Sequence, residues 1–323
     1  MDNVRNDSFD VVVVGGGTAG LAGALTLARA RRSVLVIDSG SPRNAPAAHL
    51  HGYLGYDGAS PAGLLAGGRA EVTGYGGEVR PGTVIAADRL PDGGFLVRCG
   101  DGSTVRARRL LVATGLVDEL PAVPGLRARW GRDVLHCPYC HGWEVRDLPL
   151  AVLADGPLAV HQAGLWRQWS ARTTLLSHTW PLTAADRELL AARGVGVVEG
   201  EVTGLLVDED RLTGVSLADG GVERCRALVV APRFTARSGV LTGLGLPTVA
   251  LERDGHVIGS CVESDPTTGA TALPGVWVAG NVTSPTEQIA GAAAYGVRAA
   301  AAVNADLIEE ETRRAVEAYR VTV

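Results

Sequence analysis

A buried strand, a glycine-rich turn and a helix open this chain, and together they restrict its fold more than any other feature. Residues 9–14 read FDVVVV, a β-branched run that is typical of a strand covered on both faces of a parallel sheet. GGGTAG follows at once and leads into the helix-forming segment LAGALTLARA. In this GxGxxG pattern Gly15 allows a sharp turn, Gly17 lets a pyrophosphate approach the backbone, and Gly20 lets helix and strand pack closely. A second predicted strand ends at Asp38, whose carboxylate can accept hydrogen bonds from a ribose. The pattern predicts a βαβ dinucleotide site, and the alternative is a glycine-rich turn without a ligand.

The same pattern recurs in a weaker form later in the chain. LPLAVLADGPLAVHQA at 148–163 resembles the opening unit at a shift of 139 residues, which carries Gly15 to Ala154. The shift places three residues on the glycine positions: Ala154, Gly156 and Ala159. It places Ser177 on the position of Asp38, and the next arginine, Arg187, comes ten residues later. We therefore predict a second Rossmann-like unit whose nicotinamide nucleotide site is degenerate.

Composition excludes several other classes of protein. The 323 residues are long enough for two domains, and 46% apolar with 20% charged residues is an ordinary globular balance. The net charge of −5 has no basic block, which argues against a nucleic-acid surface. The polar start MDNVRNDSFD lacks the apolar core of a signal peptide, and no apolar run is long enough to span a membrane. We expect a cytoplasmic protein that binds neither nucleic acid nor membrane.

Two further segments belong with the first strand. LLVATGLVDELPAVPG at 110–125 predicts a strand, a turn and a proline-rich crossing between domains. LPGVWVAGN at 273–281 predicts another apolar strand, and the alanine-rich segment 286–308 predicts a long helix. The N-terminus of that helix offers free N–H groups to an anion or to a polar ring edge.

A pair of cysteines lies between two histidines in HCPYCHGWE, residues 136–144. The pair has four possible interpretations: a redox disulfide, half of a zinc site, a haem attachment site, or two structural thiols. Haem attachment through CxxCH needs export, and a zinc site needs four ligands although no second CxxC is present. A CxxC at a helix start suits redox chemistry, because the helix N-terminus and a neighbouring cation lower thiolate pKa values. Cys99, Cys225 and Cys261 lie alone and are most simply structural.

In this order the motifs resemble those of the thioredoxin reductase-like flavoproteins, over nearly the whole chain. GGGTAG with Asp38 resembles the FAD fingerprint of that family, ATG at 113–115 resembles the strand that leads into the second domain, and LPGVWVAGN with EQIAGAAAYG resembles the C-terminal flavin motif. CPYC lies where the family has its redox pair, which favours the redox disulfide and no metal site. The resemblance implies an α/β fold of two Rossmann-like domains, with the second inserted into the first: 1–118, 119–238 and 239–323.

The resemblance also implies one FAD per chain. The residues expected to bind it are Gly15, Gly17, Thr18, Ala19, Gly20, Asp38, Ser39, Arg43, His51, Val84, Ala113, Thr114, Gly115, Gly280, Asn281, Gln288, Ile289 and Ala290. In the family the segment HLHGYLGYD falls near the flavin, so His49 and Asp57 are expected, together with His51, to help shape the pocket.

Departures from the family point to a narrower branch. Asn281 replaces the usual aspartate, His141 replaces the aspartate that follows the second cysteine in thioredoxin reductases, and the second nucleotide motif has lost its glycines and basic residues. These features resemble the dithiol oxidases of natural-product pathways, such as those that close the disulfides of holomycin and gliotoxin. The branch oxidises a small dithiol and passes the electrons through FAD to O2, which gives H2O2. By the same resemblance Cys137 faces the substrate and Cys140 the flavin.

The base that deprotonates the thiols is expected to be His141, with His136 as the second choice, because an ordinary histidine pKa lies near neutrality. Two other functions compete with a dithiol oxidase. One is an NADPH-dependent disulfide reductase acting on thioredoxin, and the other is a non-catalytic flavin-binding sensor. The resemblance alone implies a homodimer.

Overall fold

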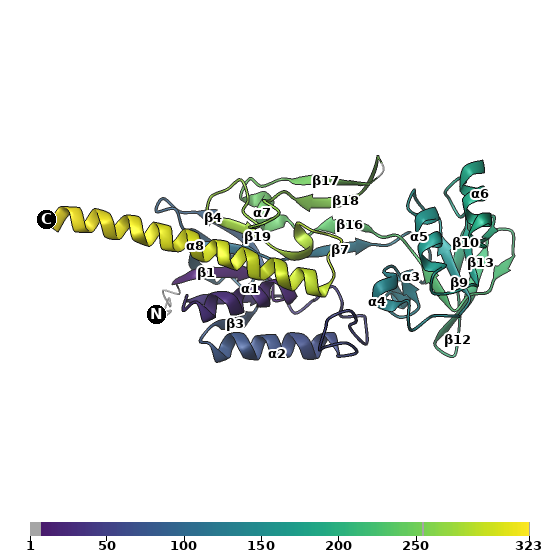
Figure 1. Cartoon of the computed structure of the whole chain (residues 1–323), viewed down its shortest axis with the longest axis horizontal. Coiled ribbons are helices and arrows are strands. Elements are labelled where there is room, and N and C mark those ends of the chain that lie inside the picture. Colours follow the sequence, from purple (N-terminus) through teal and green to yellow (C-terminus); the bar gives the residue numbers. More distant parts are fainter. Residues whose placement is uncertain (1–7, 254, 323) are drawn as a thin grey trace.

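Two α/β parts lie one after the other along the long axis of the molecule in the computed structural model, which describes residues 8–253 and 255–322 (Figure 1). The polar stretch 1–7, on which the expectation of no signal peptide partly rests, lies outside the described residues. Within those ranges no helix is both long and apolar enough to cross a membrane.

The first part is built on a mixed sheet that contains the predicted opening unit. Among the described residues its strands are β1 (Ser8–Val14), β2 (Val34–Asp38), β3 (Glu78–Pro81), β4 (Val84–Arg89), β5 (Phe95–Cys99), β6 (Thr104–Val112) and β19 (Val276–Val278). Their order is β3-β2-β1-β6-β5-β4, with β19 paired to β6; β1 is parallel to β2 and β6. The helices of this part are α1 (Thr18–Arg29), α2 (Pro61–Gly74), α7 (Gly239–Gly243) and α8 (Ile289–Thr322), with a short turn η1 (Gly280–Val282).

Both faces of β1 are buried, as its continuous β-branched run predicts. Val11 and Val13 pack with α1, α2 and α8 on one face, while the neighbouring Val12 and Val14 pack with Phe95 and α7 on the other. Because side chains alternate along a strand, an unbroken apolar run is compatible with burial on both sides.

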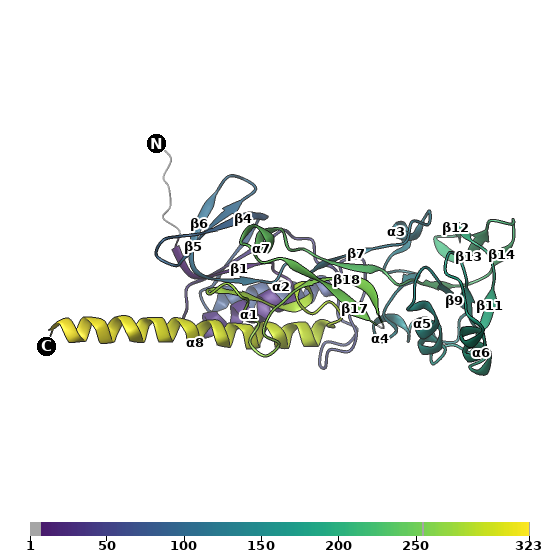
Figure 2. The same cartoon turned by 90° about the horizontal axis from the view of Figure 1, so that it is seen from above.

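Helix α8 packs against α1 through small residues. A Cβ on Gly296 would lie 2.0 Å from the carbonyl oxygen of Ala19, so only glycine lets the two helices approach this closely. The helix was predicted over 286–308, but it begins at Ile289 and continues to Thr322. Glu310 and Arg314 form an i,i+4 ion pair, and alanine, glutamate and arginine are good helix formers, so the end remains helical beyond the sheet (Figures 1 and 2).

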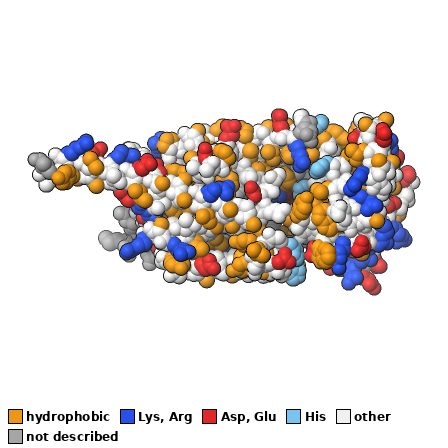
Figure 3. Space-filling view, viewed as in Figure 1, with side chains coloured by type: hydrophobic (Ala, Val, Ile, Leu, Met, Phe, Trp, Pro, Cys, Tyr) orange, Lys and Arg blue, Asp and Glu red, His pale blue; other side chains and the backbone are white. Residues whose placement is uncertain are grey.

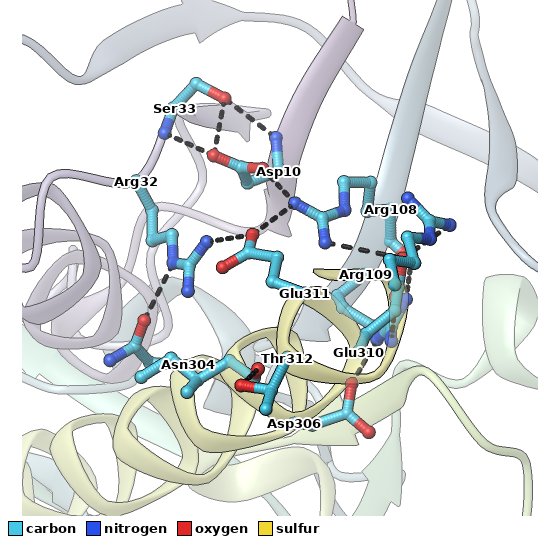
Figure 4. A network of polar contacts seen from close by, with 12 residues as sticks. Asp10, Arg32, Ser33, Arg108, Arg109, Asn304, Asp306, Glu310, Glu311 and Thr312 are labelled. Atoms are coloured by element: carbon cyan, nitrogen blue, oxygen red, sulfur yellow. Dashed lines mark hydrogen bonds and ion pairs between the residues drawn. The ribbon is translucent and has the colours of Figure 1, made fainter. Parts of the chain in front are cut away.

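A polar network holds α8 where it leaves the sheet (Figure 4). Arg109 on β6 contacts Asp306 and Glu310 at 2.5 Å each, and Arg108 contacts Glu311 at 2.8 Å. Past this network the helix projects from the molecule with acidic, basic and apolar side chains on its surface (Figure 3).

The second part repeats the βαβ arrangement. In the described chain its parallel sheet has the order β11-β10-β9-β15-β8, and a three-stranded sheet β12-β13-β14 packs beside it. The strands are β8 (Val134–Leu135), β9 (Leu150–Leu153), β10 (Thr173–Leu176), β11 (Gly196–Val198), β12 (Val202–Asp208), β13 (Arg211–Leu217), β14 (Val222–Glu223) and β15 (Ala227–Val229). The helices are α3 (Leu126–Arg129), α4 (Pro138–His141), α5 (Ala159–Trp166) and α6 (Ala184–Ala192). The succession β9, α5, β10, with the two strands parallel, confirms the predicted fold class of two Rossmann-like units.

A pair of antiparallel strands carries the chain between the parts. β7 (Leu116–Glu119) leads out, β16 (Arg233–Ala236) leads back, and the two pair in a sheet with β17 (Thr248–Arg253) and β18 (His256–Val262). The predicted inserted domain, 119–238, contains every strand of the parallel sheet β11-β10-β9-β15-β8 and of the sheet β12-β13-β14. Its first boundary falls at the last residue of β7, and its second falls just after β16.

Candidate active site

A cavity of about 740 Å³ is lined by residues from both parts. The turn after β1, the end of β2, the segment from η1 to the start of α8, and α4 with its cysteines all contribute to its walls. This volume lies in the upper range of ordinary ligand sites.

Each glycine of the opening motif meets the steric requirement expected of it. Gly15 has a φ of +103°, and a Cβ there would lie 2.5 Å from the carbonyl oxygen of Ala113. A Cβ on Gly20 would lie 1.9 Å from the carbonyl oxygen of Gly15, so this glycine holds helix and turn together. A Cβ on Gly17 would meet no heavy atom of the described structure within 4 Å, and Gly17 lines the cavity. Gly17 therefore leaves open the space that a pyrophosphate would use.

The carboxylate of Asp38 faces the same turn. Its Oδ1 accepts a hydrogen bond from the N–H of Gly16 at 3.1 Å, and its Oδ2 pairs with Arg69 at 3.1 Å. A Cβ on Gly16 would lie 2.7 Å from Cγ of Asp38, so Gly16 is a site residue that the sequence analysis did not include. The turn, the uncapped start of α1 and this acid together fit a dinucleotide such as FAD.

Most of the predicted cofactor residues line the cavity. They are Gly15, Gly17, Thr18, Ala19, Asp38, Ser39, Arg43, His51, Val84, Ala113, Thr114, Gly115, Gly280, Asn281, Gln288 and Ile289. Two of the predicted residues do not line it: Gly20, which packs α1 against the turn, and Ala290, in the first turn of α8. His49 lines the cavity too, whereas Asp57 does not.

Asn281 organises the loop in front of α8. Its Nδ2 donates to the carbonyl oxygens of Ser284, Pro285 and Glu287 at 3.1, 3.3 and 3.0 Å. An aspartate could not donate these bonds, so the departure from the family pattern has a structural role. The Oδ1 of Asn281 accepts from Arg43 at 3.3 Å.

Arg43 links this loop to the connecting strands β7 and β16. It forms a two-pronged ion pair with Asp118 at 2.7 and 2.8 Å, and its guanidinium lies over the ring of Phe234 at 5.2 Å. Phe234 in turn contacts the ring of His136 edge-on at 5.4 Å. A fixed positive charge therefore stands in the cavity wall beside the CxxC segment.

The two cysteines begin α4 and line the cavity. Cys137 is the N-cap, with extended backbone, and Cys140 lies inside the single turn of helix that follows. Both are partly buried free thiols. Because α4 has only four residues, its dipole is small, and individual hydrogen bonds matter more than the helix terminus that we invoked from the sequence.

The environment makes the two thiols unequal. A hydrogen bond donated by the Cys140 thiol is the largest influence on Cys137 and lowers its pKa to about 7; the N–H groups of Cys140 and Tyr139 and the charge of Arg43 add to the effect, against burial. The pKa of Cys140 is raised, first by the same shared hydrogen bond and then by burial and the neighbouring sulfur. The first proton therefore leaves the pair from Cys137.

His136 is a half-buried, neutral imidazole. Burial lowers its pKa, and Nδ1 lies 3.0 Å from the carbonyl oxygen of Val230. Because a carbonyl only accepts, Nδ1 carries the proton and Nε2 is left as an acceptor. His136 therefore has the tautomer that a base needs.

His141 and His51 lie where the two parts meet. Burial lowers the pKa of His141, while the charge of Glu144 opposes the effect. His51 contacts Glu144 of the second part through Nε2 and Asp57 of the first part through Nδ1, each at 3.3 Å. This contact connects the loop HLHGYLGYD to the CxxC segment.

The second nucleotide motif has been remodelled. The Oγ of Ser177 accepts from the N–H of Gly200 at 3.2 Å, and the N–H of Trp180 bonds back to the carbonyl oxygen of Ala154 at 3.1 Å. Arg187 is paired with Glu199. Asp155, in the turn itself, is a carboxyl whose pKa burial raises to about 6, so the turn is mostly anionic at pH 7. Gly156 alone keeps an open position, with no described heavy atom within 4 Å of a Cβ.

The lining residues that escaped the sequence analysis, because no local motif marks them, include Asp118, Gln162 and Arg237. Among the residues that the structure describes, no group of three or more His, Cys, Asp or Glu side chains is arranged to hold a metal ion.

A dinucleotide cradle and a CxxC pair that share one cavity, on two Rossmann-like units, define a disulfide oxidoreductase of the flavoprotein type. The chain belongs to the pyridine nucleotide-disulphide oxidoreductase family, which matches residues 9–302. The similarity to thioredoxin reductase-like proteins, predicted from the motifs, is confirmed by the comparisons below.

Two of the relatives carry the name thioredoxin reductase. Thioredoxin reductase sirT of Leptosphaeria maculans is 31% identical over 313 residues, which cover 92% of this chain and 93% of sirT. Thioredoxin reductase aclD of Aspergillus oryzae is 42% identical over 159 residues, so the match spans 47% of this chain and about half, 49%, of aclD. The crystal structure of HlmI superposes with a TM-score of 0.91 at 47% identity and covers 98% of this chain and 97% of HlmI.

Proposed function

We propose that this protein binds FAD and oxidises a small-molecule dithiol to an intramolecular disulfide, with O2 as the final electron acceptor. The observation that carries this proposal is that Cys137 and Cys140 line the same cavity as the dinucleotide cradle. The second nucleotide motif, by contrast, has the carboxyl of Asp155 in its turn, and Arg187, the next arginine after Ser177, is already paired with Glu199. The similarity to HlmI and to the fungal relatives supports a natural-product dithiol as substrate.

The reaction balances as a two-electron oxidation. The substrate loses two thiol protons and two electrons and gains an S–S bond. O2 takes up the two protons and the two electrons and becomes H2O2. FAD, when bound, supplies the two-electron relay between the cysteine pair and O2. The chain itself holds the reacting sulfurs in one cavity and moves the protons.

Cys137 is the thiol that exchanges with substrate. In the oxidised enzyme a substrate thiolate attacks its sulfur, the Cys137–Cys140 bond breaks, and a mixed disulfide forms. The second substrate thiolate then attacks the mixed disulfide and releases Cys137 as the leaving group. A thiolate with a pKa of about 7 leaves more readily than one with an ordinary value, so the low pKa of Cys137 favours this step.

A neutral histidine accepts the substrate proton. His136 offers Nε2, because its Nδ1 is held by Val230, and His141 lies directly after Cys140. The lowered pKa of each keeps it unprotonated at pH 7 and available as a base.

An NADPH-dependent disulfide reductase is the second candidate, because the relatives carry the name thioredoxin reductase. The oxidase and the reductase differ in the source and the destination of the electrons, so one pair of experiments separates them.

Oxygen uptake and H2O2 release are measured with the FAD-loaded enzyme and a series of small dithiols, beside the Cys137→Ser and Cys140→Ser variants. The oxidase predicts uptake that needs a dithiol and both cysteines. Rapid stoichiometric bleaching of the flavin by NADPH without air, with no dithiol-dependent uptake, would instead establish the reductase. We propose that the enzyme works in the cytoplasm on a small molecule and O2 alone.

A further inference from the structure

Arg237 is a cavity-lining arginine without a carboxylate partner in the part of the chain that the structure describes. Its exposed side chain makes a hydrogen bond from Nη1 to the carbonyl oxygen of Ser41 at 3.4 Å, which is long for such a bond. Arg43, which also lines the cavity, is by contrast held by Asp118. Glu287 lines the cavity as well, but no ion pair joins it to Arg237 within the described residues. Arg237 is therefore available to an anion that enters the cavity.

The main chain of Arg237 is attached to the turn that follows β6. Its carbonyl oxygen accepts a hydrogen bond from Oγ1 of Thr114 at 2.6 Å, and its N–H donates to the carbonyl oxygen of Gly115 at 3.0 Å. The same turn packs on the glycine-rich turn, since a Cβ on Gly15 would lie 2.5 Å from the carbonyl oxygen of Ala113. Arg237 is therefore fixed to a direct neighbour of the loop that would hold a pyrophosphate.

The side chain of Arg237 lies over a second neighbour of that loop. Ser41, which it contacts, comes three residues after Asp38, and Asp38 accepts a hydrogen bond from the N–H of Gly16 in the glycine-rich turn at 3.1 Å. Main chain and side chain of Arg237 thus contact the two segments that line the cavity together with the glycine-rich turn. This arrangement places the guanidinium at the dinucleotide cradle.

The other charges near the cradle are already balanced. Asp38 is paired with Arg69. Arg43 is paired with Asp118. A pyrophosphate diester is ionised at each phosphorus at neutral pH, and the N-terminus of α1 supplies only a partial positive charge. Arg237 is the lining arginine of the described chain that remains to neutralise such an anion.

A negatively charged substrate is the competing partner for Arg237. Substrate sulfurs must reach Cys137, and the charges that shift the pKa of the neighbouring Cys140 are those of Cys137 and Arg43. Arg43 is therefore the cation at the sulfur end of the cavity. The contacts of Arg237 lie instead on segments that belong to the cradle.

The position of Arg237 also matters for the connection between the two parts. Arg237 directly follows β16, and Gly115, to which its N–H donates, directly precedes β7. The bond continues the ladder in which Ala236 pairs with Leu116. Whatever holds the side chain of Arg237 therefore also holds the base of the two connecting strands.

We propose that the guanidinium of Arg237 binds the pyrophosphate of the bound dinucleotide and thereby fixes the connecting strands β7 and β16 to the cofactor. The weak bond to Ser41 is exchanged for a charge-assisted one, which is shorter and stronger. The proposal rests on the FAD binding that the proposed function contains. It makes Arg237 a cofactor-binding residue and not a participant in the sulfur chemistry.

The first test measures the affinity of the FAD-free protein for FAD, ADP and adenosine by equilibrium dialysis in the wild type, Arg237→Gln and Arg237→Lys. Arg233→Gln is the matched control, because Arg233 is exposed on β16 and does not line the cavity. Arg237→Gln should bind FAD and ADP at least about tenfold more weakly and adenosine within about twofold of the wild type. Arg237→Lys should recover part of the loss, and Arg233→Gln should behave as the wild type.

Thermal unfolding of the FAD-free protein separates binding from a structural role. The two hydrogen bonds to the turn after β6 use the main chain of Arg237, so its substitution should leave the Tm unchanged. A lower Tm with equal losses for all three ligands would assign Arg237 a structural role and overturn the proposal. Unchanged FAD and ADP affinity with a higher KM for a dithiol would overturn it in favour of the substrate.

Hydrogen exchange of the β7 and β16 amides tests the link to the strands, with the ADP concentration raised for Arg237→Gln until its occupancy equals that of the wild type. ADP should slow the exchange in the wild type and in Arg233→Gln, and should slow it less in Arg237→Gln. Equal slowing at equal occupancy would overturn the link. A wild type that binds neither FAD nor ADP would end the FAD assignment as well, whereas tight and equal binding by wild type and Arg237→Gln would remove only the role of Arg237.

Discussion

Replacing Cys140 by alanine should raise the pKa of Cys137 from about 7 toward its ordinary value of 9.0. The hydrogen bond from the Cys140 thiol is the largest cause of the low value, and alanine removes that donor while Cys137 stays buried. Serine keeps a hydroxyl that can donate in the same place, so Cys140→Ser should retain most of the lowering. The two variants therefore differ in one hydrogen bond.

The magnitude follows from the thiolate fraction. A thiol with a pKa of about 7 is half ionised at pH 7, whereas one with a pKa of 9.0 is about 1% ionised, which is a difference of about 50-fold or about 2.3 kcal/mol. The more basic thiolate is also the better nucleophile, by about eightfold for a Brønsted coefficient near 0.45. The net loss of reactivity at pH 7 is then only about sixfold. The midpoint of the pH profile is a sharper measure than the rate at one pH.

Alkylation by iodoacetamide of the FAD-loaded, phosphine-reduced protein, followed by mass spectrometry of the Cys137 peptide between pH 5.5 and 10, reports that midpoint. Cys225, whose pKa burial raises to about 12, serves as the internal thiol that should stay unlabelled. A midpoint in the alanine variant equal to that of the wild type would refute the claim that the Cys140 thiol stabilises the Cys137 thiolate.

Four other outcomes are expected. Gly17→Ala should fold normally and bind FAD at least about tenfold more weakly, whereas Gly156→Ala, its equivalent in the second unit, should leave FAD binding unchanged; equal effects in equilibrium dialysis would contradict the assigned cradle. Cys140→Ser should trap an oxidised substrate as an adduct in intact-protein mass spectrometry and Cys137→Ser should not; the reverse pattern would exchange their roles. Anaerobic NADPH should leave the flavin spectrum unchanged, and fast bleaching would show that the second site works. The projecting end of α8 exposes apolar side chains such as Tyr319, 71% exposed, and we expect a homodimer; a monomeric mass in light scattering at micromolar concentration would refute it.

Local patterns predicted the scaffold well, because their requirements are met within a few residues. The turn needs Gly15 for its positive φ, and α1 needs Gly20 for close contact with that turn, whatever lies elsewhere in the chain. The eroded repeat was visible because a βαβ unit keeps its spacing even when its glycines are lost. The extent of α8 was predicted less well, since an apolar pattern ends where packing ends, while helix propensity and ion pairs continue to Thr322.

The sequence by itself determined the dinucleotide cradle, the second Rossmann-like unit and the CxxC pair, since each depends on neighbouring residues and on backbone sterics. Only the tertiary structure decided the electrostatics of the site. Arg43 meets Asp118 and Asn281, which lie 75 and 238 residues away in the chain, and His51 meets Glu144 across the two parts. Gln162 could be recognised as unpartnered only after its surroundings were in place, because a missing hydrogen bond is a property of the packed molecule and not of any segment.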